Sequence, residues 1–428
     1  MTGTSAYILG LDLGTSGFRA QLVCEGQRVF AAHQARIDTY AKQHNFLPSE
    51  QSTQDWLLML DGLFAQLKDF LPQVKAVIAD ATSSTVIGLD RAKQIIEPAI
   101  MYNDNRAQAE AESYRNVLTA DSPAQGAQAS LAKALWLSKH TAAKHIWHQL
   151  DWLYAQLLDS PLQSAYSDVN TQLKMGVDPV QLSWPDSVQT LAKWPLPRIR
   201  LPGSPIGTVG RQARQRWGLP VSCQVYAGTT DSIASFLATP AARPGDLVIA
   251  MGSTLAFKLV SSKPLASAKH GLYSHRLGQA WLVGGASNAG GAIYQTRFNT
   301  ERLSQLSQQL VGRAQPELAR YPLTQTGERF PLADPRHPAS HFDDLTDEQA
   351  FISMTEGLVA LEQAAYDQLT RMGAKIECIF SIGGGVRNQA WQARRRQLFG
   401  DRLAPLPDPD ASTNSAAFGV TRLITESF

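Results

Sequence analysis

The 428-residue sequence has few cysteines and no long apolar stretch. Its three cysteines, Cys24, Cys223 and Cys378, are widely scattered and odd in number. They predict neither a disulfide framework nor a zinc site, and they suit a reducing, cytoplasmic location. No apolar run reaches membrane-spanning length, and no basic region precedes the first apolar stretch. We therefore expect neither a membrane anchor nor a signal peptide.

The sequence also lacks an excess of charge of either sign. Lys and Arg number 39 and Asp and Glu 37, a formal net charge of +2 at pH 7. Nucleic-acid and membrane partners usually require a basic excess or cluster, so none is predicted. The one dense basic group, residues 394–396, lies in a helical pattern beside Trp391 and Leu398, and we interpret it as a solvated helix face. The length allows two to three domains, and 44% apolar residues suffice for two cores.

Two common nucleotide-binding signatures are missing. Glycine-rich residues 284–291 and 383–385 each follow a strand pattern and precede a helix pattern. Neither matches the dinucleotide fingerprint with its ribose-binding acid, and neither carries the lysine of the usual phosphate loop. These two fold classes are disfavoured, although such glycines allow the backbone to approach a ring or sugar closely.

The sequence does contain an apolar strand that carries one carboxylate and then turns on glycines and hydroxyls. Residues 7–23 read as a β-hairpin with residues 14–17 at its tip. Such a tip can hold phosphate oxygens on backbone N–H groups, and Asp12 at its mouth can hold Mg²⁺ directly or through water. The alternative is a tight hairpin with a solvent-exposed Asp.

A second copy of this pattern occupies residues 246–260. Gly252 stands where the first copy has Gly14, and Ala250 stands where it has Asp12. The turn thus tolerates a methyl group, so the carboxylate of Asp12 is not needed merely to build it. Two such hairpins predict a duplicated domain that closes on one nucleotide.

Polar clusters follow two further apolar strands. Residues 80–85 are rich in hydroxyls and follow the strand pattern of residues 74–79, a place where α/β proteins usually bind ligands. Asp104 precedes a predicted helix that runs through Glu110 and Tyr114, and it either caps that helix or accepts hydrogen bonds from a polyol. A plain Ser/Thr turn is the alternative for residues 80–85.

Asp231 stands in the first turn of a predicted helix, directly after a strand and Gly228. A helix N-terminus favours an ionised carboxylate, so Asp231 can accept a proton from a bound hydroxyl. An ordinary N-terminal helix acid is the alternative. Further helices are predicted from an N-cap at Thr53, over two segments within residues 130–158, and after a capping box at residues 346–349.

Taken together, these motifs resemble the FGGY carbohydrate kinases, which belong to the superfamily of sugar kinases, actin and heat-shock ATPases. The likeness covers nearly the whole chain. The matching segments are residues 10–16 (Gly-Leu-Asp-Leu-Gly-Thr-Ser), 104–107 (Asp-Asn-Arg-Ala), 227–231 (Ala-Gly-Thr-Thr-Asp), 252–254 (Gly-Ser-Thr) and 383–388 (Gly-Gly-Gly-Val-Arg-Asn).

The resemblance implies an α/β fold of two ribonuclease-H-like domains, residues 1–240 and 241–428, with ATP in the cleft between them. It implies that Asp231 is the catalytic base and that Asp12 lies near Mg²⁺. The residues implied at the phosphates are Gly14, Thr15, Ser16, Gly252, Ser253 and Thr254, and those implied elsewhere around the nucleotide are Gly290, Gly384, Gly385 and Asn388.

The expected sugar is inferred from a segment in which the sequence departs from the family pattern. Residues 80–85 replace the glutamine-containing sugar motif of xylulose and glycerol kinases and, with residues 101–104, look more like the D-ribulose kinase branch of cyanobacteria and plants. The implied substrate-binding residues are Asp104, Ser83, Ser84 and Asp231, and the implied product is D-ribulose 5-phosphate. The alternatives are a D-xylulose kinase and a nucleotide-gated switch of the actin or chaperone type. The protein is expected to be a monomer or a small homo-oligomer.

Overall fold

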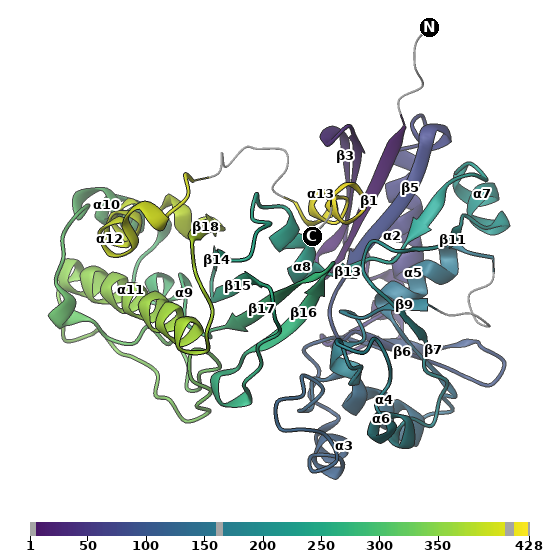
Figure 1. Ribbon diagram of the computed structural model, residues 1–428, viewed down its shortest axis with the longest axis horizontal. Coiled ribbons are helices and arrows are strands. Elements are labelled where there is room, and N and C mark those ends of the chain that lie inside the picture. The colour runs from purple at the N-terminus through teal and green to yellow at the C-terminus, as the bar shows by residue number, and fades with distance from the viewer. Residues whose placement is uncertain (1–5, 160–165, 407–414, 427–428) are drawn as a thin grey trace, which may run out of the picture. The chain divides into compact units, whose positions relative to one another are not determined.

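The chain forms two units, each with its own β-sheet and apolar core (Figure 1). The computed structural model describes residues 6–159, 166–406 and 415–426. The first unit comprises Met1–Ala238, Arg276–Gly278 and Ser412–Phe428, and the second comprises Thr239–His275 and Gln279–Ala411. Strands and helices alternate in both units, which confirms the predicted α/β class.

The main sheet of the first unit has β1 at its centre. Strand β1 (Tyr7–Gly14) pairs antiparallel with β2 (Gly17–Cys24) and parallel with β5 (Val74–Ala81). This confirms the first predicted hairpin. The strand order is β11-β12-β5-β1-β2-β3, and β13 also pairs with β5. The remaining bounds are β3 (Gln27–Ala35), β11 (Pro205–Thr208), β12 (Gln224–Tyr226) and β13 (Thr229–Thr230).

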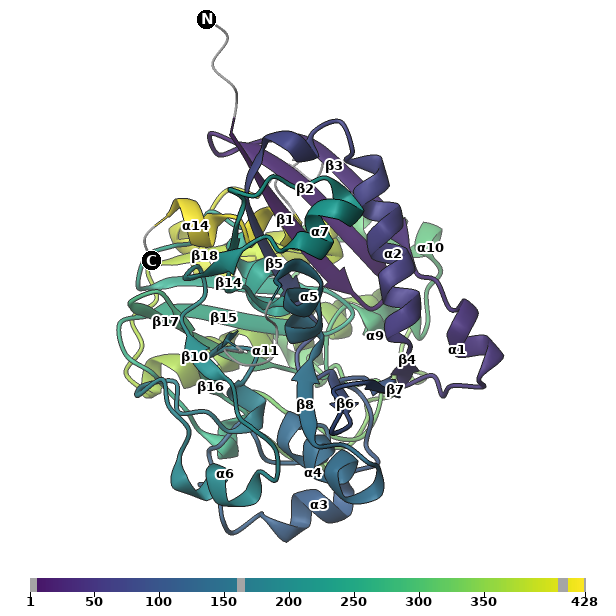
Figure 2. The ribbon, with the colours of Figure 1, turned by 90° about the vertical axis from the view of Figure 1, so that its right-hand side faces the viewer.

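Successive side chains of β1 point alternately into the main core and to the opposite face of the sheet, where Asp12 lies. Leu9, Leu11 and Leu13 are fully buried in a core shared with α2 (Thr53–Gln66), α5 (Gln149–Leu157) and α7 (Arg211–Trp217), which lie together in Figure 2. Since successive side chains of a strand point to opposite faces, Gly10 and Asp12 lie on the other face. Helix α8 (Asp231–Leu237) and the short helix α13 (Ala416–Gly419) pack against β1.

Helix α2 begins one residue earlier than predicted, because its N-cap is Ser52. The Ser52 hydroxyl accepts a hydrogen bond from the N–H of Gln54 at 3.0 Å. The Thr53 hydroxyl instead donates to Glu97 at 2.5 Å. The helix position was thus predictable to within one residue, whereas the capping residue depended on a partner distant in sequence.

A smaller sheet in the first unit, of order β4-β7-β6-β8, lies beyond the carboxyl end of β5. Its strands and nearby helices enclose a third core. The two amphipathic helices predicted within residues 130–158 are confirmed as α4 and α5. The bounds are α1 (Thr39–Gln43), β4 (Glu50–Gln51), β6 (Val86–Leu89), β7 (Ile95–Ile100), α3 (Gln108–Ser113), α4 (Ser130–His140), β8 (His145–His148), β9 (Tyr166–Asp168), α6 (Asp186–Leu191) and β10 (Arg198–Arg200).

The second unit is built on a sheet of order β16-β17-β15-β14-β18. Strands β14 and β15 form the second predicted hairpin, and the capping box of Thr346 and Gln349 starts the long helix α11 as predicted. The bounds are β14 (Asp246–Met251), β15 (Leu255–Ser261), β16 (Tyr273–Leu277), β17 (Ala280–Ala286), α9 (Ala292–Gln295), α10 (Thr300–Gln309), α11 (Asp347–Arg371), β18 (Cys378–Ile382) and α12 (Gln389–Phe399).

The last described residues, 415–426, return to the first unit, whereas the sequence assigned them to the second domain. Figure 1 shows α13, in yellow, beside β1, in purple. A Cβ atom on Gly10 would lie 1.9 Å from the carbonyl oxygen of Ala417, so only glycine permits this approach. Gln21 of β2 also donates to the Ser415 hydroxyl at 2.6 Å. Helix α14 (Arg422–Thr425) follows.

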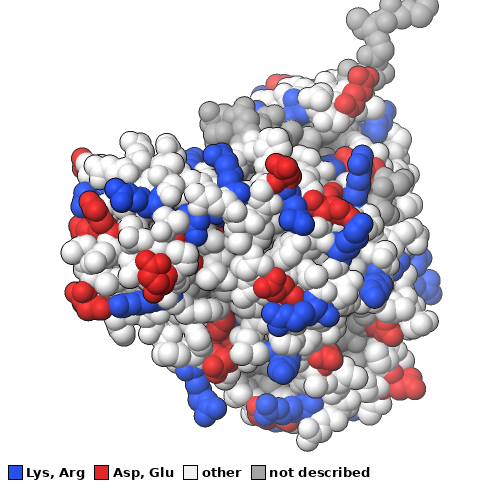
Figure 3. All heavy atoms as spheres, turned by 60° about the vertical axis from the view of Figure 1, so that its left-hand side comes forward, with Lys and Arg blue, Asp and Glu red and all other residues white. Residues whose placement is uncertain are grey.

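One face of the molecule shows how its surface charges are distributed. On the face shown in Figure 3, basic and acidic side chains are interspersed. Among the helices of the described ranges, none combines the length and apolarity that a membrane span requires.

The interpretation of residues 394–396 as a solvated face is wrong for two of the three arginines. Arg395 is fully buried, and its Nε donates to Glu362 at 2.7 Å. Arg394 pairs with the buried Glu356 at 2.8 Å, and only Arg396 is exposed. The partners lie on α11, distant in sequence, so the local pattern around α12 carried no signal of them. Removing one partner of a buried ion pair leaves a buried charge uncompensated.

We therefore expect Arg395→Met to lower the free energy of unfolding by about 3–5 kcal/mol, because Glu362 would stay buried without its cation. Urea denaturation measures this change. The matched control is Arg396→Met in the same helix, for which a change within about 0.5 kcal/mol is expected. Equal losses in the two variants would contradict the assigned role of the ion pair.

Candidate active site

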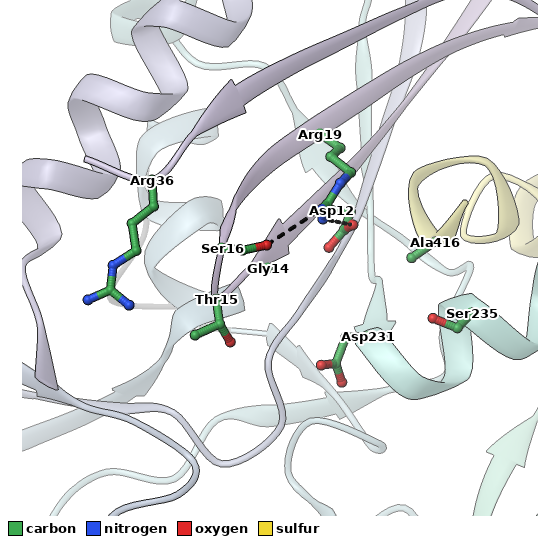
Figure 4. A pocket seen from close by; sticks show the side chains of 9 residues that line it. All are labelled: Asp12, Gly14, Thr15, Ser16, Arg19, Arg36, Asp231, Ser235 and Ala416. Carbon is green, nitrogen blue, oxygen red and sulfur yellow. Dashed lines mark hydrogen bonds and ion pairs between the residues drawn. The ribbon is translucent and has the colours of Figure 1, made fainter. Parts of the chain in front are cut away.

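The tip of the first hairpin opens into a cavity of about 620 Å³, called the first-unit cavity here. Gly14 pairs with Gly17 across a two-residue turn of Thr15 and Ser16. Gly17 has φ +144°, and a Cβ atom there would lie 2.4 Å from the Gln34 carbonyl oxygen, so the turn requires glycine. Figure 4 shows the lining residues, which are Asp12, Gly14, Thr15, Ser16, Arg19, Arg36, Asp231, Ser235 and Ala416.

Asp12 lies at the mouth of this tip and is largely buried. Arg19 of β2 donates to its Oδ2 at 3.1 Å and to the Ser16 hydroxyl at 3.3 Å. Burial raises the pKa of Asp12, and the nearby Arg19 opposes that shift only in part. The exposed-carboxylate alternative for Asp12 therefore does not hold in the structure.

Asp80 is a third carboxyl group at this site, and the sequence reasoning did not assign it a role. Parallel pairing sets Asp80 of β5 opposite Asp12 of β1. Asp80 is fully buried, and no described N–H group or hydroxyl donates to either of its oxygens. Burial, followed by the negative charges of Asp12 and Asp231, raises its pKa well above the usual range.

A local signal for Asp80 did exist. Like Asp12, it is a single acid within an apolar strand, a placement that demands compensation. Its position opposite Asp12 depends on the register of two strands distant in sequence.

Asp231 is the first residue of α8, as predicted, and it lines the first-unit cavity with Asp12 (Figure 4). The N–H of Ser232 donates to its Oδ1 at 2.7 Å. The bend before it is fixed, because Gly228 donates to the Tyr154 hydroxyl at 2.7 Å and a Cβ atom on Gly228 would lie 1.7 Å from the Ala79 carbonyl oxygen. The fold thus brings the two predicted catalytic residues into one cavity.

The donor set around Asp12 fits a hard divalent cation. The described residues contain no group of three or more His, Cys, Asp or Glu side chains placed to enclose a metal ion. Asp12 lines the first-unit cavity and is backed by Asp80, whose oxygens accept no hydrogen bond from the described residues. Mg²⁺ in phosphoryl-transfer sites is typically held by one or two carboxylates, water and the nucleotide phosphates. Asp12 is the residue that would hold it.

Residues 82–85 form a tight turn after β5, called the hydroxyl turn here. Ser83 is half-exposed. Ser84 is buried with φ +64°, and its hydroxyl has no partner within the described part of the chain. Of the two serines predicted to bind sugar, only Ser83 is accessible in this conformation.

Asp104 is held firmly by its neighbours and does not cap a helix. Helix α3 has Ala107 at its N-cap, so the capping alternative is wrong. Ser49 donates to Oδ2 at 2.7 Å, while Arg106 donates to Oδ1 from N and Nε at 2.9 Å each and to Oδ2 from Nη2 at 2.7 Å. Burial acts to raise the pKa of Asp104, but the hydrogen bonds from Arg106 and Ser49 outweigh it and lower the pKa.

The second unit contains its own cavity of about 780 Å³. Of the nucleotide residues predicted there, Gly252, Ser253, Gly384, Gly385 and Asn388 line it. Asn388 also caps α12, because its Oδ1 accepts from the N–H of Trp391 at 3.0 Å. Sequence reasoning missed the lining residues Tyr294, Phe298, Ser307 and Gln308, which follow the glycine-rich segment and read only as helix.

Thr254 and Gly290 are not among the described lining residues of the second-unit cavity. Gly290 packs on the tip of the second hairpin, where a Cβ atom would lie 2.5 Å from the Ser253 carbonyl oxygen. Its role in the structure is therefore close packing of backbone on the hairpin tip, at a position that only glycine permits.

Comparison with known proteins identifies the family. The N-terminal domain model of the FGGY family of carbohydrate kinases matches residues 7–238, and its C-terminal domain model matches residues 247–423. The chain belongs to the FGGY family of carbohydrate kinases. It is therefore a sugar kinase that transfers a phosphoryl group from ATP.

Individual relatives agree with this assignment. The chain is 28% identical to a xylulose kinase of Klebsiella pneumoniae over 62% of this chain and 57% of that protein, and 26% identical to one of Escherichia coli over 92% and 85%. The crystal structure of a xylulose kinase from Rhodospirillum rubrum superimposes with a TM-score of 0.82 at 21% identity, covering 98% of this chain and 89% of that one. This FGGY kinase thus has the two-domain fold of the actin and hexokinase type.

The buried carboxyl group of Asp80 predicts a pH-dependent effect on stability. The raised pKa means that the folded protein holds this proton more tightly than the unfolded chain does. The stabilisation is complete below the unfolded pKa of about 3.9 and is lost as pH rises through the folded pKa. We expect Asp80→Asn to be more stable relative to wild type at pH 8 than at pH 5, that is, to have the larger relative free energy of unfolding at pH 8, measured by denaturant titration without ligands.

The control for this experiment is Asp69→Asn, which removes an exposed carboxyl group from the same unit. The difference in free energy of unfolding between Asp69→Asn and wild type should change less between pH 5 and pH 8. An equal change in both variants would show that Asp80 is not the group responsible.

Proposed function

We propose that this FGGY kinase transfers the γ-phosphoryl group of ATP to a primary hydroxyl of a ketopentose, and that it prefers D-ribulose. The observation that supports the chemistry is the placement of Asp12, Asp231 and the tip residues Gly14, Thr15 and Ser16 around one cavity. The product would be D-ribulose 5-phosphate.

Asp231 would orient the attacking hydroxyl and accept its proton. Phosphoryl transfer depends mainly on positioning and on stabilising charge on the phosphoryl oxygens. The backbone N–H groups at the hairpin tip can hold those oxygens, and the guanidinium groups of Arg19 and Arg36 line the same cavity. Mg²⁺, when bound at Asp12, would supply further neutralisation of phosphate charge.

The choice of sugar rests on the hydroxyl turn. D-Ribulose and D-xylulose differ in configuration at C3, so discrimination requires groups that meet that hydroxyl from one side. Ser83 is the half-exposed hydroxyl of the turn, and Asp104 is the candidate acid. A site built to pair with a hydroxyl rejects a substrate that leaves its polar groups unpaired. D-Xylulose is the second candidate, because the curated relatives described above are xylulose kinases.

We expect Asp231→Asn to lower kcat for sugar phosphorylation by about 10²-fold or more, because the amide cannot accept the hydroxyl proton. Coupled ADP release with the preferred ketose measures this loss. The control is Asp186→Asn, which changes an acid at the first position of α6 that is not among the lining residues of the first-unit cavity. Near-normal turnover in a folded Asp231→Asn protein would refute its role as base.

The sugar preference is tested with both ketoses under identical conditions. We expect kcat/KM for D-ribulose to exceed that for D-xylulose by about tenfold or more, the scale on which hydrogen-bonding sites discriminate. Asp104→Ala should remove most activity toward D-ribulose. The variant lacks the candidate acid for the sugar hydroxyl, and Ser49 and Arg106 lose the carboxylate to which they donate. Equal or greater efficiency with D-xylulose would overturn the ribulose assignment and favour the second candidate.

A further inference from the structure

The hydroxyl turn is held in a conformation that it would not adopt alone. Ser84 has φ +64°, in the left-handed region that residues other than glycine rarely occupy. Such conformations persist only where the surrounding structure fixes them. The contacts around the turn therefore determine where Ser83, its half-exposed hydroxyl, is presented.

Gln149, at the start of α5, holds the turn from one side. Its Oε1 accepts hydrogen bonds from the Thr82 backbone N–H at 3.2 Å and from the Thr82 hydroxyl at 2.6 Å. Its own backbone N–H donates to the Thr85 carbonyl oxygen at 3.2 Å. A backbone N–H can only donate, so the atom that faces Thr82 must be the amide oxygen, and this fixes the orientation of the carboxamide.

The start of α5 is itself immobilised by buried polar contacts. His148 donates its backbone N–H to Asp151 at 2.8 Å in a capping box, and its ring lies 2.8 Å from the Ser130 hydroxyl. Gln149 is therefore attached to a fixed support, which is what holding a turn in place requires.

Lys133, from α4, holds the turn from the other side. Its Nζ donates to the carbonyl oxygens of Ser84 at 2.5 Å and Met101 at 2.8 Å. The Met101 carbonyl oxygen also accepts the backbone N–H of Asp104 at 3.2 Å. One buried amine thus joins the hydroxyl turn to the segment that carries the second candidate for sugar binding.

Both residues are costly choices for a protein interior. Gln149 and Lys133 are fully buried, and the Nε2 of Gln149 finds no partner among the described residues. Burial, aided by the charge of Lys174, lowers the pKa of Lys133 to about 7. Apolar side chains would fill the same space without these costs. The polar contacts to the turn are therefore what the two residues contribute.

We infer that Gln149 and Lys133 are positioning residues for the sugar, which hold the hydroxyl turn so that Ser83 meets the substrate. This inference rests on the proposed role of the turn in sugar binding. Because both side chains are buried, they act through the turn and do not touch the substrate. Their loss should weaken sugar binding selectively, whereas a merely structural role would affect sugar and ATP alike.

The test compares Gln149→Leu, which removes the acceptor oxygen, with Gln149→Glu, which retains it. With the ketose that gives the highest kcat/KM, we expect Gln149→Leu to raise KM for the sugar about tenfold or more, as small displacements of a binding group do. The KM for ATP should stay within about twofold. Gln149→Glu should give a sugar KM between those of wild type and Gln149→Leu. The control is Gln156→Leu in the same helix, for which both KM values should stay at wild-type levels.

Two further variants keep the inference testable if Gln149→Leu does not fold. Thr82→Val removes one donor to Gln149 at constant shape, and Lys133→Met removes the amine, with the exposed Lys139→Met of α4 as its control. Both should raise the sugar KM selectively. An unchanged sugar KM in these folded variants, or a parallel rise in the KM for ATP, would overturn the inference. A preference for D-xylulose would refute the proposed substrate only, because these comparisons use whichever ketose is preferred.

Discussion

The parallel pairing of β1 with β5 is the constraint on which the site depends. It sets Asp12 and Asp80 opposite each other on the face of the sheet that carries α8 and α13, while alternate leucines of β1 enter the main core. Two carboxyl groups so placed cannot both ionise cheaply. The apolar packing on the opposite face of β1 must therefore offset the free energy that this pair costs, and a divalent cation at Asp12 would relieve it.

Local patterns in the sequence were sufficient to predict the two hairpins, the position of Asp231 in the first turn of α8 and the start of α11. Each of these features is determined by residues that are close together in the sequence. The pairing of Asp12 with Asp80, the burial of Arg395 against Glu362 and the contact of Gly10 with Ala417 could not be read in this way. In each case the partner is distant in sequence, and register or packing, not composition, brings it close.

The two hairpins share a glycine and hydroxyl residues at the tip but differ in the surroundings of that tip. In the first, Asp12 places a carboxyl group beside a tip that lines the first-unit cavity. In the second, Ala250 takes the equivalent position, and the tip is packed closely by Gly290 while Gly252 and Ser253 line a larger cavity with aromatic walls. The turns also differ in length, because Gly14 pairs with Gly17 across two residues whereas Met251 pairs with Leu255 across three.

The return of residues 415–426 to the first unit affects the order in which the protein is completed during synthesis. β1 is translated before the second unit, whereas Ala417, which lies over Gly10, is translated after it. Helix α8 can pack on this face of the central strand early, but the part of it covered by α13 stays uncovered while the second unit is translated. Domains usually fold as units during translation, so the second unit can be finished before the first. The packing of α13 on β1 therefore forms only after the residues of the second unit have been translated.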